Sequence, residues 1–342
     1  MKSRAPLLRF RTRPIRVLAV FGALLLGPAL SGMHPAVAQN VVDDAAQDVV
    51  RKQDATPYCG DEGVWLQILG GGGQDLDDGE TPASYAVFLD NAARLIVDPA
   101  SGASSLFDRS GGRMTDVDAI VLSHNGPERA IDLPAFLLGA QLAERNRLLP
   151  IIGPTGANTP RRHLSTTELV ARLVGPDGAF PSLSSTLPPN AVGRFRASPR
   201  DVPATGSRRW SDFASAHLEL EALPVTHGDI PALAWAVELG GKRIVFAADS
   251  APQRGALAAF AADADALVIH HSIPDNARGT LTGFHMTPTQ IGQLAAQAKV
   301  RMVILGHRAN RTRGRETVST QAIEAHYQGS LIFANDLECW GL

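Results

Sequence analysis

The chain has 342 residues, of which 44% are hydrophobic and 19% are charged, and its formal net charge is -2. This composition is typical of a globular protein long enough for one large domain or two small ones. The near-neutral charge gives no support to a nucleic acid or an anionic membrane surface as the main partner.

The first 38 residues have the pattern of a secretory signal peptide. Scattered basic residues precede an apolar run from Val17 to Leu30, and the small residues "AVA" follow at 36–38. This order predicts cleavage after Ala38, a mature chain that begins at Gln39, and a periplasmic or secreted location. The alternative is an uncleaved anchor, but the run is shorter than the ~20 residues of a spanning helix. We therefore expect no membrane association after cleavage.

Residues 39–58 are polar and unpatterned, which predicts a flexible lead-in to one domain over 59–342. The only two cysteines, Cys59 and Cys339, lie near the two ends of this domain. In an exported protein an even cysteine count suggests a disulfide, and both residues flank strand-like runs. We expect them to be bridged; the alternative is two unrelated thiols.

The first half of the domain alternates strand-like and helix-like segments. A glycine-rich turn follows the first predicted strand, "VWLQIL", and its spacing does not match a nucleotide-binding loop. The glycines more simply allow a tight turn beside a site. The further predicted elements are a hairpin from "SYAVFLD" and "ARLIVD" that turns around Asn91-Ala92, a strand "AIVLS", and a helix "DLPAFLLGAQLAERN".

The middle of the chain, 154–210, is less regular, apart from a helix "STTELVARLV" with a capping box from Ser165 to Glu168. The stretch 176–215 is rich in Pro, Ser and Arg, and we expect an insertion that is either a substrate-facing loop or a surface excursion. Alternation is regular from residue 218, with strands "LELEALPV", "LAWAVEL", "RIVFAA", "ALVIH" and "MVILG" and helices "ALAAFAA" and "TPTQIGQLAAQA". Such interleaving predicts an α/β or mixed α+β protein.

Five of the predicted strands end in a residue that can bind metal. Ligand sites of layered α/β proteins lie outside the carboxyl ends of their strands, so the pattern predicts one metal site at a sheet edge. Histidine nitrogens with one or two carboxylates suit zinc, iron or manganese, and zinc is the expected metal for hydrolysis. The residues are His124, His227, Asp249, the pair His270 and His271, and His307.

The order of these segments resembles the metallo-β-lactamase superfamily, in particular its tRNase Z-like and phosphodiesterase-like branch. The resemblance covers residues 60–342 and implies an α+β fold, a four-layer αββα sandwich with a metal site at one edge of its two sheets. It is carried by "LGGGG", "LIVD", "VLSH", "PVTHGDIPALAWAVE", "IVFAADS", "LVIHHS", "HMTP" and "VILGHR".

The family signature, His-x-His-x-Asp-His, aligns with residues 124–129 and is only partly kept. His124 matches the first histidine, but Gly126 replaces the second, Glu128 the aspartate and Arg129 the last histidine. The downstream motifs match better. There the resemblance implies a third-motif histidine, a bridging aspartate, a last ligand and a histidine near the scissile phosphate: His227, Asp249, His307 and His285.

The resemblance thus leaves three ligands for the first metal, His124, His227 and Asp249, with an open fourth place. That is a workable one-zinc catalytic site. A second ion would have Asp249, His307 and Glu128. Arg129 carries a permanent positive charge beside these carboxylates, so we expect it to take the place of a second cation and to repel one.

The first functional hypothesis is an exported one-metal hydrolase that acts on a phosphodiester or another ester. Glu128 or Asp249 would take the proton of the attacking water, His285 would protonate the leaving oxygen, and Arg129 would hold an anionic small-molecule substrate. Export argues against tRNA, and we expect no nucleic-acid partner. The second hypothesis is a catalytically degenerate member that serves as a binding module. A β-lactam-hydrolysing enzyme is a third and weaker alternative. His270 and His271 receive no role.

Overall fold

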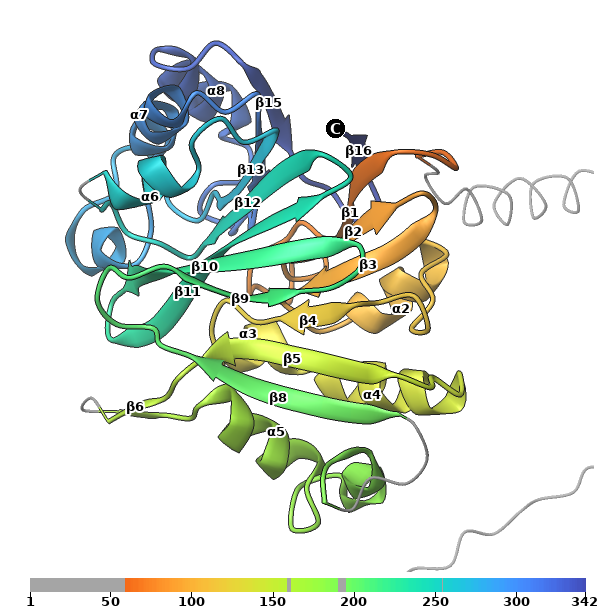
Figure 1. The fold of residues 1–342 in the computed structure, drawn as a ribbon. Coiled ribbons are helices and arrows are strands. Elements are labelled where there is room, and N and C mark those ends of the chain that lie inside the picture. Colours follow the sequence, from red (N-terminus) through yellow and green to blue (C-terminus); the bar gives the residue numbers. More distant parts are fainter. Residues whose placement is uncertain (1–58, 159–160, 190–194, 254) are drawn as a thin grey trace, which may run out of the picture. The chain divides into compact units, whose positions relative to one another are not determined.

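The computed structural model describes residues 59–158, 161–189, 195–253 and 255–342 (Figure 1). The predicted signal peptide (1–38) and lead-in (39–58) lie outside the described residues. Among the residues described, no helix is both long enough and apolar enough to cross a membrane.

Two seven-stranded sheets form the centre of the fold. The first has the order β16-β1-β2-β3-β4-β5-β8. Its strands are β1 (Val64–Gly70), β2 (Ser84–Leu89), β3 (Ala92–Val97), β4 (Ala119–Val121), β5 (Leu148–Pro154), β8 (Arg196–Val202) and β16 (Cys339–Gly341). The second has the order β15-β14-β13-β12-β11-β10-β9. Its strands are β9 (Trp210–Ala214), β10 (Leu218–His227), β11 (Ile230–Leu239), β12 (Lys242–Ala248), β13 (Ala266–His270), β14 (Met302–Gly306) and β15 (Ser330–Phe333).

Helices cover the outer face of each sheet (Figure 1). The helices are α2 (Ala103–Arg109), α3 (Pro127–Ala130), α4 (Leu133–Leu142), α5 (Thr166–Val174), α6 (Ala256–Phe260), α7 (Pro288–Ala298) and α8 (Glu316–Glu324), with 3-10 turns η1 (Pro181–Thr186) and η2 (Gly279–Gly283). A small hairpin pairs β6 (Ala157–Asn158) with β7 (Arg162–His163). The expected capping box begins α5 at Ser165, and a second capping box begins α7 at Thr287.

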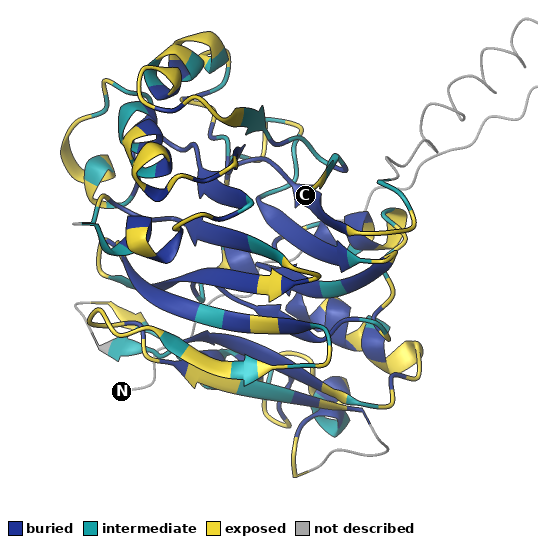
Figure 2. Cartoon of the chain, turned by 45° about the horizontal axis from the view of Figure 1, so that its top comes forward, coloured by how far each residue is buried: buried dark blue, intermediate teal, exposed yellow. Residues whose placement is uncertain are grey.

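Side chains of successive strand residues fill different layers of the core. In β12, Ile244 and Phe246 belong to the cluster between the two sheets, whereas Val245 and Ala247 pack against the helices. Because both faces of the strand are covered, its sequence is continuously apolar instead of alternating. Figure 2 shows the strands of both sheets largely buried, with exposed residues on the outer faces of the helices. These layers confirm the predicted four-layer α+β sandwich.

Strand direction explains why one edge of the sheets collects functional side chains. In the first sheet β3, β4 and β5 are parallel. In the second sheet β10, β12, β13 and β14 all run the same way, because β11 is antiparallel to both β10 and β12. The carboxyl ends within each set therefore lie at the same edge of its sheet.

The expectation of an irregular insertion at 176–215 is wrong in part. Residues of β8 pair in parallel with β5 along seven positions, and α5 is the crossover helix between the two strands. β9 then begins the second sheet by pairing with β10. The strand was missed because β8, with the sequence "RASPRDV", lies at the sheet edge and is partly exposed, so it carries proline and arginine instead of an apolar run.

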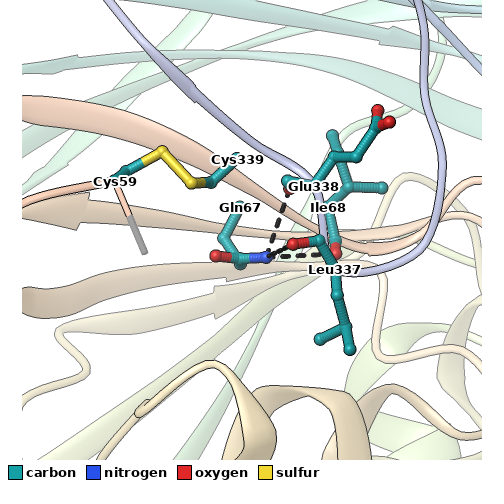
Figure 3. The surroundings of a disulfide bond; sticks show 6 residues. All are labelled: Cys59, Gln67, Ile68, Leu337, Glu338 and Cys339. Atoms are coloured by element: carbon teal, nitrogen blue, oxygen red, sulfur yellow. Dashed lines mark hydrogen bonds between the residues drawn. A yellow bond between two sulfur atoms is a disulfide. The ribbon is translucent and has the colours of Figure 1, made fainter. Parts of the chain in front are cut away.

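Cys59 and Cys339 form the expected disulfide, with their Cα atoms 5.9 Å apart (Figure 3). Cys339 starts the last strand, β16, which pairs with β1. Beside the bridge, the side-chain amide of Gln67 donates to the carbonyl oxygens of Leu337 at 2.9 Å and Glu338 at 3.2 Å. The bridge and these hydrogen bonds together tie the end of the chain to the first sheet.

We expect replacement of both cysteines by serine to lower the free energy of unfolding by roughly 3–5 kcal/mol, because the bridge closes a loop of nearly the whole domain. Urea unfolding of the double variant and of the wild type with and without reductant measures the effect. A urea midpoint that is the same in all three samples would contradict it.

Candidate metal centre

Strand ends from both sheets meet at the candidate site. His124 follows β4, His227 ends β10, Asp249 follows β12, His270 ends β13 and His307 follows β14. The two sheets are joined here directly, because the backbone N–H of Leu233 and the indole N–H of Trp235 on β11 donate to the carbonyls of Ser123 and Leu122.

The backbone is strained at three strand ends near the site, those of β3, β12 and β14. Asp98, Ala248 and His307 have φ values of 53°, 53° and 50°, in the left-handed region that non-glycine residues rarely adopt. Strain of this kind persists where the surrounding structure imposes it, and it concentrates at functional sites. At Ala248 the unusual backbone directly precedes Asp249, the centre of the cluster.

The carboxylate of Asp249 contacts side chains on all sides. Its Oδ2 lies 2.5 Å from Nη2 of Arg129 and 3.5 Å from Nε2 of His124. Its Oδ1 lies 2.9 Å from Nδ1 of His270 and 3.2 Å from Nδ1 of both His285 and His307. Asp249 is thus the residue that the two halves of the cluster share.

Two groups of three residues place their ligand atoms within 4.8 Å of one another: His124, His227 and Asp249, and Asp249, His270 and His307. Ligand atoms of a tetrahedral zinc site lie ~3.3 Å apart when the metal–ligand bonds are ~2.0 Å, so modest side-chain shifts would bring either group to the spacing that an ion needs. His227 Nδ1 is 3.1 Å from the carbonyl oxygen of Phe284. Donation to that carbonyl leaves Nε2 as the free nitrogen, as is usual for a metal-binding histidine.

The chemistry of these donors also fits a metal. Burial lowers the pKa of His227 to about 4 and that of His270 to about 3, so both rings are neutral at pH 7, the form that binds metal. Three buried histidine nitrogens of the cluster have no hydrogen-bond partner among the described residues: His124 Nε2, His285 Nδ1 and His307 Nε2. Buried polar atoms are normally satisfied, and a metal ion would satisfy such atoms.

Arg129 is completely buried in the same cluster. Besides its contact with Asp249, its Nη2 is 3.4 Å from Nδ1 of His270, its Nη1 donates to the carbonyl of Ala83, and its Nε lies 3.8 Å from Asp98. Burial lowers the pKa of Arg129, but Asp249 and Asp98 outweigh this effect and raise it above its ordinary value. The guanidinium is therefore a fixed positive charge between two buried carboxylates.

This placement corrects one expected role. A side chain that is completely buried and bonded to Asp249 does not face a substrate, so Arg129 is not a substrate-holding residue. Burial raises the pKa of Asp249, but His270 and Arg129 hold it well below its usual range. Asp249 is accordingly an ionised carboxylate that already has one cationic partner.

A pocket of about 310 Å³ opens beside the first group of three. His124 and Glu128 line it on the side of the cluster, Arg162 and His163 come from β7, and Ile230 and Pro231 add apolar surface. Glu128 is partly exposed, and its Oε1 lies 3.6 Å from Nε2 of His124. The first group therefore borders open space through His124.

The structure brings together all the residues expected at the site, His124, Glu128, Arg129, His227, Asp249, His285 and His307. It adds His270, which sequence reasoning left without a role although its position at a strand end was the available signal. His271 is not part of the cluster, because its Nε2 lies 2.8 Å from the hydroxyl of Ser319 on α8. Adjacent residues at a strand end point to opposite faces, which separates the two histidines.

Comparison with known proteins agrees with this architecture. The model of the β-lactamase superfamily domain matches residues 152–308. The chain has the metallo-β-lactamase fold. The expected resemblance to that superfamily is thereby confirmed. A comparison of the sequence with proteins of curated function finds no match.

Similar solved structures include a metallo-β-lactamase fold protein, YhfI, from Bacillus subtilis, with a TM-score of 0.59 and 18% identity over 81% of this chain and 98% of that one. The short form of human tRNase Z has a TM-score of 0.58 and 14% identity over 81% and 98% of the two chains. Zn²⁺-bound PqqB from Methylobacterium extorquens has a TM-score of 0.56 and 13% identity over 81% and 100%. At these identities the similarity is one of fold.

We expect Arg129→Met to lower the free energy of unfolding in chelator by roughly 3–5 kcal/mol, because it leaves Asp249 as an uncompensated buried charge. Added zinc should recover part of this loss, since a metal can neutralise the same carboxylate. Chemical unfolding with chelator and with zinc measures both effects.

Arg145→Met is the matched control, because Arg145 is also buried but donates to the carbonyls of Met114 and Leu148. It should be destabilised without a zinc response larger than that of the wild type. An Arg129→Met protein as stable in chelator as the wild type would count against the ion pair.

Proposed function

We propose that this chain is a metal-dependent hydrolase that uses one metal ion and acts on a phosphodiester or another ester. The observation that carries the proposal is the contact between Arg129 and Asp249 inside a cluster of metal-ligand residues that borders a pocket. Through this contact the positive charge of Arg129 partly neutralises Asp249. The remaining negative charge suits one metal ion, and the guanidinium repels a second.

His124, His227 and Asp249 would hold this ion on the pocket side of the cluster. Two histidine nitrogens and a carboxylate oxygen suit zinc, and a zinc-bound protein of the same fold is among the similar structures. When bound, the ion supplies an attacking water of lowered pKa and polarises the ester. His307 contacts the other oxygen of Asp249 and belongs to the second group. There Arg129 lies 3.4 Å from Nδ1 of His270 and would repel an ion.

The remaining residues handle protons. Glu128, at the pocket and near His124, is placed to take the proton of the attacking water, and Asp249 is the alternative acceptor. His285 is nearly buried beside Asp249, with Nδ1 at 3.2 Å from the carboxylate. Contact with Asp249 orients the ring of His285 and would allow it to donate a proton to the leaving oxygen.

The substrate that fits best is a small ester with negative charge. The pocket of about 310 Å³ is at the lower end of the size of ligand sites and has both cationic and apolar walls. The tRNase among the similar structures supports a phosphodiester. The signal-like N-terminal pattern and the disulfide support export to an oxidising compartment, away from tRNA.

One observation favours a second candidate function. Arg129 already neutralises Asp249 without any metal, so the fold does not require an ion at this point. The pocket would then belong to a non-enzymatic binding module. The two candidates differ in metal dependence, which can be measured.

We expect the purified chain to hydrolyse bis(p-nitrophenyl) phosphate, to lose this activity in chelator and to regain it with zinc. Asp249→Asn should lower the rate by about 100-fold or more, because Asp249 is shared by both groups of ligands.

His271→Asn is the control, since His271 is equally buried but contacts Ser319 outside the cluster. It should keep most of the activity. A wild-type rate that chelator does not change would eliminate the metal-dependent mechanism, and a folded wild type with no hydrolysis and no bound zinc would favour the binding module.

A further inference from the structure

The carboxylate of Glu128 occupies the space that a side chain at residue 126 would need. A Cβ atom placed on Gly126 would lie 2.5 Å and 2.6 Å from the two carboxylate oxygens of Glu128, and 2.7 Å from its Cδ. Contacts of this length do not occur in real structures, so any side chain at 126 would displace Glu128. Glycine at 126 is thus what allows Glu128 to fold back over this point.

Two departures from the family signature are therefore physically coupled. The resemblance puts a histidine at 126 and an aspartate at 128, whereas this chain has Gly126 and Glu128. Removing the histidine side chain vacates a space beside His124, and the additional methylene of glutamate lets the carboxylate reach back into it. A side chain at 126 would make the flexible end of Glu128 move away from this space.

The position of the carboxylate is also suitable for a ligand. Oε1 of Glu128 lies 3.6 Å from Nε2 of His124, and the side chain lines the pocket beside the first group. Carboxylate oxygens bind zinc at ~2.0–2.2 Å, a range close to that of histidine nitrogens. The partly exposed side chain of Glu128 has the freedom to approach an ion that His124, His227 and Asp249 hold.

We propose that Glu128 is a metal ligand that replaces the missing histidine at residue 126, so that two histidines and two carboxylates hold the ion: His124, His227, Asp249 and Glu128. This inference rests on the proposed one-metal function. Ligation through one oxygen leaves the other free to accept a proton, so activity alone does not separate the two roles. Metal affinity does separate them.

The experiment is a zinc titration against a competing chelator for the full chain and three variants. Glu128→Ala should weaken zinc binding by about 10-fold or more, because it removes a ligand and not only a proton acceptor. The double variant Gly126→His/Glu128→Ala should recover most of the affinity, since the histidine then has room and supplies a nitrogen at the vacated place. Glu238→Ala, on the exposed side chain that pairs with Arg243, is the control and should bind zinc like the wild type.

Unfolding of each variant in chelator shows whether it is folded, and a partly exposed Glu128 should be replaceable without large loss of stability. Cobalt substitution gives a second measurement, because the visible absorption of bound Co²⁺ changes with its ligands.

Wild-type affinity in Glu128→Ala would overturn the proposal while leaving the one-metal hydrolase intact. A wild type that binds no zinc would overturn both. Failure of the double variant to recover affinity, although it is folded, would also count against the replacement of one ligand by the other.

Discussion

The buried ion pair between Arg129 and Asp249 determines what the site of this protein can do. Asp249 is almost completely buried, and an isolated carboxylate there would either cost several kcal/mol of stability or take up a proton. Arg129 prevents both outcomes, because its guanidinium lies 2.5 Å from the carboxylate of Asp249. Its Nε also lies near a second buried carboxylate, that of Asp98. Burial keeps His227 and His270 neutral at pH 7, whereas Arg129 is a fixed positive charge in the cluster.

This charge has a consequence for metal binding. The second group, with Asp249, His270 and His307, has Arg129 within 3.4 Å of one of its nitrogens, whereas the first group borders the pocket. A divalent ion in the second group would meet the guanidinium at short range, in an environment with little water to screen the repulsion. Arg129 also reaches the first group, because it bonds Oδ2 of Asp249, the oxygen nearest His124. There, however, the carboxylate of Glu128 adds negative charge that offsets the guanidinium. The carboxylate of Glu128 and the pocket beside His124 thus both favour the first group.

The amino-acid sequence predicted the fold and the location of the cluster because both depend on local patterns. Continuous apolar strands indicate a sheet that is covered on both faces, and metal-binding residues at their ends (His124, His227, Asp249 and His307) indicate a site at one edge of the sheet. The ends of β12, β13 and β14 meet because these strands are parallel. Edge strand β8 escaped prediction because its partly exposed sequence has no apolar run. The partners of individual side chains could not be predicted, because they depend on packing between elements that are distant in the sequence. Thus His270 contacts Asp249, the adjacent His271 contacts Ser319 instead, and Arg129 is buried.

The most direct test of a one-ion site is the anomalous scattering of zinc in crystals of the full chain grown with excess zinc. We expect one strong zinc peak per chain, among His124, His227 and Asp249, with Arg129 still in contact with Asp249. Two strong peaks per chain on either side of Asp249, or an Arg129 side chain displaced from Asp249 by an ion, would contradict it.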